Sequence, residues 1–151
     1  MPAVVVARQR ARSIPVARIA RAVQRALDDL GRPAADVDVA VVDDDEIRAI
    51  NTAHRDVHRR TDVIAFPLEI AGTASGLLGQ IVISADAAVR QARRVGVPLT
   101  LELELLATHG VLHLAGYDDR DPVEADLMHR RERDLLGPAV PARLWKGLLR
   151  A

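Results

Sequence analysis

The chain has 151 residues, 49% of them hydrophobic, with no cysteine and a formal net charge of zero at pH 7. This length and composition suit one globular domain, residues 1–151, with one buried core. The lack of cysteine excludes disulfide bonds, so any metal ion must be bound by histidine or carboxylate side chains. We find no apolar run long enough for a membrane span. The first residues carry their charges after the apolar stretch, unlike a secretory signal, so we expect a cytoplasmic protein.

Hydrophobic periodicity and turn residues predict strands and helices in alternation along the chain. Asp43–Asp45 and Ser84 are expected to cap the helices that follow them, and residues 69–76, rich in Gly, Ser and Thr, are expected to form a loop. The irregular connections favour an α+β or mixed α/β fold, with one mixed sheet covered by helices. The expected strands are 3–7, 37–42, 62–66 and 77–83, and the expected helices are 14–30, 46–53, 85–95, 100–115 and 121–136.

Two histidines lie four residues apart on the predicted helix 100–115. His109 and His113 continue an i, i+4 row that starts at Leu101 and Leu105, so both side chains lie on one face and can converge on one ion. The spacing alone is a weak motif, because two core histidines would give the same pattern. A second pair with this spacing, at positions 54 and 58, lies among positively charged neighbours, and we interpret it as a solvated or substrate-facing segment.

The residues after this helix supply a third candidate ligand. Gly116 can turn the chain sharply and bring Asp118 or Asp119 back toward the histidines. Two ligands from a helix and one from beyond it leave a position open for water, as in catalytic zinc sites. The spacing is that of the metzincin protease motif H-E-x-x-H-x-x-G-x-x-H, which favours Asp119 over Asp118 as the ligand. Gly110 replaces the general-base Glu of that motif, so the pattern indicates a metal but not a peptidase.

Residues 109–119 (HGVLHLAGYDD) resemble the motif H-G-x-L-H-L-x-G-Y-D-H of the YbeY family of bacterial metal-dependent endoribonucleases. Residues 51–55 and 61–67 are similar to its N-x-x-x-R and T-D-V-L-S-F-P stretches, and residues 79–84 to its G-D-I-x-I-S strand. Met128 and Glu132 resemble its final helix. The departures are Asp119 for His, Gln80 for Asp and Ala65 for Ser.

The resemblance implies a single-strand endoribonuclease that acts on rRNA, at the 3′ end of the small-subunit rRNA, and in ribosome quality control. It implies one bound Zn²⁺, or another divalent ion, on His109 and His113, with Asp119 in the place of the third ligand. Arg55 would face the RNA, and a ribosomal or assembly-factor protein would be a partner. Two alternatives stay open: a ribosome-assembly or binding factor with a structural metal, and a metallohydrolase of another substrate. His129, on the last predicted helix, is expected to be exposed and separate from the site.

Overall fold

The computed structural model describes residues 3–7, 13–53, 62–67, 77–117 and 120–137. Every predicted strand and helix is present, with bounds within two residues of those expected from the sequence. The predicted loop 69–76 lies outside the described residues. The elements are β1 (Ala3–Ala7), α1 (Val16–Asp29), β2 (Asp36–Val42), α2 (Asp44–Ala53), β3 (Val63–Pro67), β4 (Leu77–Ser84), α3 (Ala85–Val95), α4 (Leu99–Leu114) and α5 (Pro122–Leu136).

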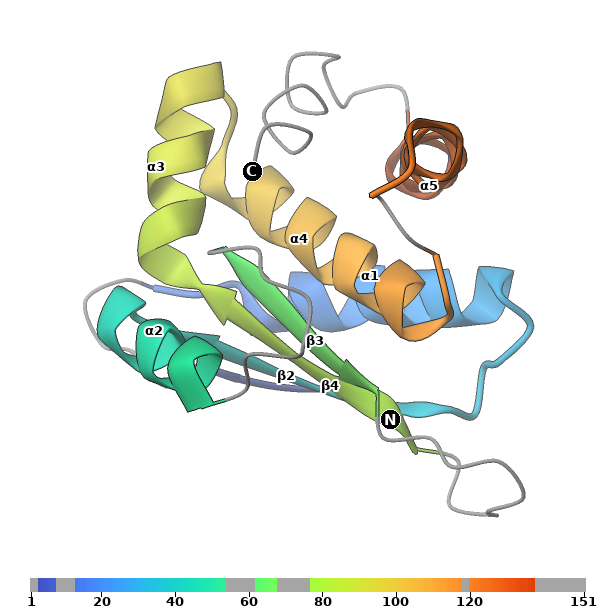
Figure 1. Ribbon diagram of the computed structural model, residues 1–151, viewed down its shortest axis with the longest axis horizontal. Coiled ribbons are helices and arrows are strands. Elements are labelled where there is room, and N and C mark those ends of the chain that lie inside the picture. Colours follow the sequence, from blue (N-terminus) through green and yellow to red (C-terminus); the bar gives the residue numbers. More distant parts are fainter. Residues whose placement is uncertain (1–2, 8–12, 54–61, 68–76, 118–119, 138–151) are drawn as a thin grey trace.

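The described strands form one mixed sheet with the order β1-β2-β4-β3 (Figure 1). Neighbours β1, β2 and β4 pair in parallel, whereas β3 pairs antiparallel with β4. Parallel neighbours need a crossover connection, and the chain supplies α1 between β1 and β2. The predicted mixed α/β fold is confirmed.

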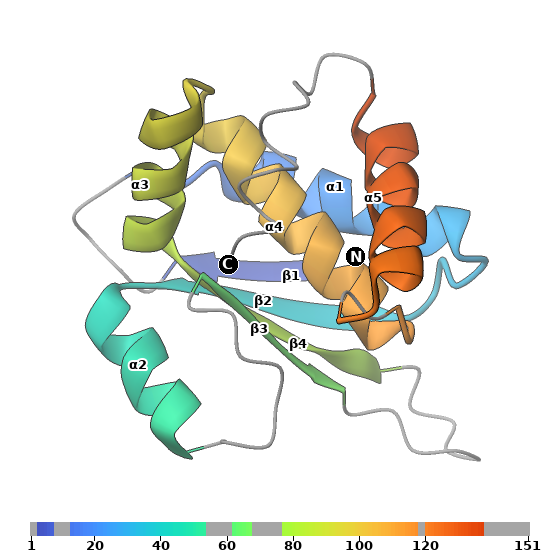
Figure 2. The ribbon, with the colours of Figure 1, turned by 45° about the horizontal axis from the view of Figure 1, so that its top comes forward.

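Helices cover both faces of the sheet (Figure 2). Successive residues of a strand point to opposite faces, and the strands are apolar on both sides. Helix α2 packs on one face, where Ile47 joins Val42, Ile64 and Val82 in a small cluster. The larger core lies on the other face, under α1, α3 and α4. Its central strand residues are Val37, Val39, Val41, Val63, Ile81 and Ile83.

Hydrogen bonds at the helix starts agree with the predicted caps. The Ser84 Oγ accepts a hydrogen bond from the Ala87 backbone N–H at 3.0 Å, and the Asp43 Oδ1 accepts one from Glu46 at 2.8 Å. Each satisfies a backbone donor that has no partner within the helix itself. These local interactions fix where the helices begin.

Helix α4 lies between the sheet and α5, and almost all its side chains are buried. No described helix is by itself long and apolar enough to cross a membrane; α3 and α4 meet that length and composition only together, as a pair bent by 118°. Helix α4 packs on the sheet along one side and on α5 along another. Its side chains can therefore contact residues of both the sheet and α5.

Candidate metal centre

His109 and His113 converge at the carboxyl-terminal end of α4, as their spacing predicts. His109 is fully buried, whereas His113 is half-buried. Their Nε2 atoms are 2.9 Å apart, and the two rings meet edge to face at an interplanar angle of 85°. The two nitrogens therefore face the same point at the edge of the core.

The other nitrogen of each ring is in contact with a hydrogen-bond acceptor. His109 Nδ1 lies 3.0 Å from Glu132 Oε1, and His113 Nδ1 lies 3.0 Å from the Tyr117 carbonyl oxygen. A carboxylate and a carbonyl can only accept, so both Nδ1 atoms must donate. In a neutral imidazole the other nitrogen then carries the electron pair. Both Nε2 atoms, which lie 2.9 Å apart, consequently carry an electron pair.

This arrangement suits a cation. Two nitrogen electron pairs at 2.9 Å repel each other unless a positive charge lies between them. Zinc–nitrogen bonds of about 2.0–2.1 Å at a tetrahedral angle would hold two nitrogens about 3.3 Å apart, which requires the rings to separate by only a few tenths of an ångström. Imidazole nitrogen is also a ligand that zinc prefers. The two histidines therefore fit the metal expected from the sequence.

The chain turns sharply just after His113. Gly116 has a φ of 104°, and two backbone hydrogen bonds close the helix end, from Gly116 N–H to the His113 carbonyl and from Tyr117 N–H to the Leu112 carbonyl, each at 3.0 Å. This pair is the Schellman motif. It turns Tyr117 back so that its carbonyl accepts from the His113 ring. The predicted turn at Gly116 thus also orients one of the histidines.

The third candidate ligand lies outside the described residues. This holds for Asp119 and for its rival Asp118, as well as for Arg55 and the second histidine pair, 54 and 58. Within ranges 3–7, 13–53, 62–67, 77–117 and 120–137, no group of three His, Asp or Glu side chains is arranged to hold an ion. Asp119 as a ligand and Arg55 as the RNA-facing residue stay predictions.

Helix α5 contributes a buried polar pair that the sequence did not reveal. Glu132 is fully buried, and its Oε1 lies 3.2 Å from His129 Nδ1 as well as 3.0 Å from His109 Nδ1. The rings of His109 and His129 are stacked, with their centroids 6.3 Å apart. The expectation of an exposed, separate His129 was wrong: its side chain is 8% exposed, because this face of α5 packs against α4.

Glu132 keeps its charge despite its burial. Burial is the largest influence and by itself would raise the pKa of the carboxyl group. The hydrogen bonds from His109 and His129, together with the positive charge that these rings carry when protonated, outweigh it and lower the pKa below its usual value. Its Oε1 accepts from both histidines, while Oε2 is buried without a hydrogen-bond partner among the described residues. The site therefore contains a fixed negative charge directly behind His109.

Gly110 occupies the place of the general-base Glu in the metzincin motif, and it faces Ile81 of the sheet. A Cβ added to Gly110 would lie 2.9 Å from both Cδ1 and Cγ2 of Ile81 in β4. Real Cβ atoms do not approach other carbons so closely, so a glutamate would require the Ile81 side chain or α4 itself to shift. The packing thus gives a physical reason for the glycine and agrees with the argument against a peptidase.

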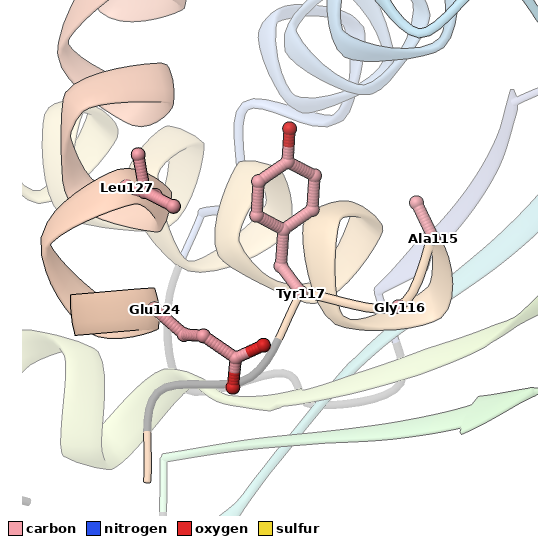
Figure 3. Close-up of a pocket in the computed structure, with 5 residues that line it drawn as sticks. All are labelled: Ala115, Gly116, Tyr117, Glu124 and Leu127. Carbon is pink, nitrogen blue, oxygen red and sulfur yellow. The ribbon is translucent and has the colours of Figure 1, made fainter. Parts of the chain in front are cut away.

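A shallow pocket lies where α4 ends and α5 begins (Figure 3). Its wall on one side is the turn Ala115, Gly116 and Tyr117, and on the other side Glu124 and Leu127 of α5. The Leu127 side chain is 52% exposed, and the Tyr117 ring stands between the turn and α5 (Figure 3). The turn that orients His113 therefore borders an opening with both apolar and acidic groups.

Comparison with known proteins gives a consistent result. The family described as "Endoribonuclease YbeY" matches residues 5–139. The Endoribonuclease YbeY of Syntrophotalea carbinolica is 41% identical over 133 residues, which cover 85% of this chain and 89% of that protein. The protein of the same name from Aquifex aeolicus is 40% identical over 101 residues, 67% of each chain.

A solved structure agrees with the fold. The solution structure of TM1509 from Thermotoga maritima superimposes with a TM-score of 0.57 at 22% identity, covering 98% of this chain and 91% of that one. At this level of identity the likeness supports the fold alone. The family match over residues 5–139, with relatives at about two-fifths identity, goes further. The chain belongs to the Endoribonuclease YbeY family.

Proposed function

We propose that the chain is a metal-dependent endoribonuclease that cleaves single-stranded RNA. One Zn²⁺, or another divalent ion, would be held by His109, His113 and Asp119. The observation that carries this proposal is the convergence of the two Nε2 atoms at 2.9 Å, with both Nδ1 atoms held by acceptors. Family membership supports the choice of RNA as the substrate.

The residues of the chain would position the ion and the phosphate. When bound, the ion would polarise a phosphate oxygen and increase the acidity of a water molecule. His109 and His113 are already oriented by Glu132 and by the Tyr117 carbonyl, so little freedom is lost on binding. Arg55 is proposed to bind a phosphate oxygen and to offset the charge that builds up during cleavage.

We infer further that the substrate is rRNA, at the 3′ end of the small-subunit rRNA, in maturation and in ribosome quality control in the cytoplasm. The chain has one Phe, one Trp and one Tyr, so stacking on bases contributes little affinity. Contacts to the RNA backbone would dominate, giving steep salt dependence and low sequence preference. A ribosomal or assembly-factor protein would then supply the specificity.

The test measures bound metal and RNA cleavage in the same preparations. We expect the zinc-loaded protein to hold about one ion per chain and to cleave single-stranded RNA, with cleavage lost in chelator. His113→Ala should lose both the ion and cleavage. Arg55→Ala should keep the ion and lose about 10²–10³-fold in cleavage rate, the usual effect of removing one group that stabilises developing charge. His58→Ala, in the other pair with the same spacing, should keep the ion.

Two outcomes would contradict the proposal. Equal cleavage by the wild type, His113→Ala and Arg55→Ala would point to a contaminating nuclease and leave the binding-factor alternative ahead. Metal binding without any cleavage would make the ion structural. The metal affinities of Asp118→Ala and Asp119→Ala decide between the two candidates for the third ligand. We expect Asp119→Ala to lose metal affinity and Asp118→Ala to keep it.

A further inference from the structure

Glu132 is the buried acidic group closest to the histidine pair among the described residues. Glu132 lies on α5, 23 residues after His109, and its side chain contacts the His109 ring. This side chain has no exposure to solvent. A buried carboxylate is costly unless it is paired and hydrogen-bonded. Its contacts with His109 and His129 offset this cost, and they indicate what Glu132 could do.

One role would be purely structural. The contacts of Glu132 Oε1 with His109 on α4 and with His129 on α5 join the two helices, and such a contact could serve only to hold them together. The geometry argues for more. Glu132 contacts Nδ1 of His109, while Nε2 of the same ring faces His113. The contact thus determines which nitrogen of His109 carries the proton and which way the ring points.

The two histidines differ in how their Nδ1 is held. His113 donates to the backbone carbonyl of Tyr117, a group that no substitution of a side chain removes. His109 depends on the side chain of Glu132. The pair therefore offers an internal comparison, because a change at Glu132 should alter the tautomer of one ring and leave that of the other.

We propose that Glu132 is a positioning residue of the metal centre, whose carboxylate fixes His109 as the Nδ1–H tautomer with Nε2 directed at the ion. This inference rests on the proposed metal site. Groups that hydrogen-bond to metal-binding histidines orient them and increase their basicity, and their loss typically costs about 10–100-fold in metal affinity. Glu132 has the position and the chemistry of such a group.

The test compares Glu132→Gln with wild type and with Glu104→Gln. Glutamine keeps the size of the side chain but removes the charge. Glu104 is a matched control, because it is a largely buried glutamate on α4 that pairs with Arg18 rather than with a histidine. Zinc affinity is measured by competition with a chromophoric chelator on the full chain. We expect about 10–100-fold weaker binding for Glu132→Gln and no comparable loss for Glu104→Gln.

A second readout does not need the metal. Long-range ¹H–¹⁵N spectra of the metal-free protein, recorded at a pH at which both rings are neutral, report the tautomer of each ring. We expect Nδ1–H for both His109 and His113 in wild type. Glu132→Gln should shift only His109 toward the Nε2–H form. A contact that merely held the helices together would lower the melting temperature without this selective change.

The measurements distinguish a failure of the role proposed for Glu132 from a failure of the proposed metal site. Wild-type zinc affinity and tautomers in folded Glu132→Gln would overturn the role of Glu132 while leaving the proposed function intact. Absence of zinc binding by the wild type would overturn the proposed function, and this inference with it. If Glu132→Gln does not fold, the wild-type spectrum still decides, because an Nε2–H tautomer at His109 would refute the inference.

Discussion

Gly110 is a position where α4 comes very close to β4, and Gly110→Ala tests this contact. The added Cβ would lie 2.9 Å from Cδ1 and Cγ2 of Ile81 and 3.1 Å from its Cγ1. Overpacking a core costs about 1–3 kcal/mol, whereas alanine is favoured over glycine inside a helix by about 1 kcal/mol. Ile81 is fully buried in the strand and has little room to move. The balance is a net loss of up to about 2 kcal/mol in the free energy of unfolding.

Urea and thermal unfolding measure this loss. For a chain of this length, a loss of about 2 kcal/mol corresponds to a fall of roughly 4–8 °C in Tm. Repeating Gly110→Ala in two Ile81 variants then separates the cost of overpacking from the helix preference of alanine. Ile81→Val removes Cδ1, and we expect it to reduce the penalty of Gly110→Ala. Ile81→Ala removes all three contacting atoms, so in that background Gly110→Ala should stabilise the protein by up to about 1 kcal/mol.

The sign of the change in the free energy of unfolding shows which contribution dominates in Gly110→Ala. Ala49→Gly, at an exposed position of α2, measures the helix preference of alanine in this protein and should cost about 1 kcal/mol. If Gly110→Ala stabilises the wild type by that same amount, α4 does not approach β4 as closely as described. The physical account of the missing glutamate would then fall as well.

Two further predictions concern polar groups that hold the helices in place. The Asp44 carboxylate accepts hydrogen bonds from Arg90 Nη1 and from Ser84 Oγ, each at 2.7 Å, and the Arg90 hydrogen bond is the main cause that lowers the pKa of Asp44. The stabilisation is therefore present above the unfolded pKa of about 3.9 and is lost as the pH falls through the lower folded value. Asp44→Asn should cost about 1 kcal/mol or less at pH 7, because Arg90 is 62% exposed and the pair is screened, and a difference from wild type that stays constant in unfolding experiments down to pH 3 would contradict this. Asp121 caps α5 by accepting from the Glu124 N–H at 3.1 Å, so Asp121→Ala should lower the free energy of unfolding by about 1 kcal/mol; an unchanged Tm would show that the cap contributes nothing.

The sequence alone determined the order and bounds of the described helices and strands. These depend on interactions between residues close together in the chain. Apolar residues repeat every two positions along β2 and at helical spacing along α1. Ser84 and Asp43 cap the helices that they directly precede, and Gly116 ends α4 by adopting a positive φ. The convergence of His109 and His113 was predictable for the same reason, because residues four apart in a helix share a face.

Only the tertiary structure decided what lies around these histidines. The contact between His109 and Glu132, 23 residues apart, depends on how α5 packs against α4, and no local pattern encodes that packing. For the same reason His129, which is polar and near the end of the chain, was wrongly expected to be exposed. The sequence showed that Gly110 stands where the motif has a catalytic glutamate. The physical reason, the contact with Ile81, depends on the distance between α4 and the sheet, which the sequence does not show. Short-range periodicity thus determined the elements and the histidine pair, whereas long-range packing determined the groups that orient them.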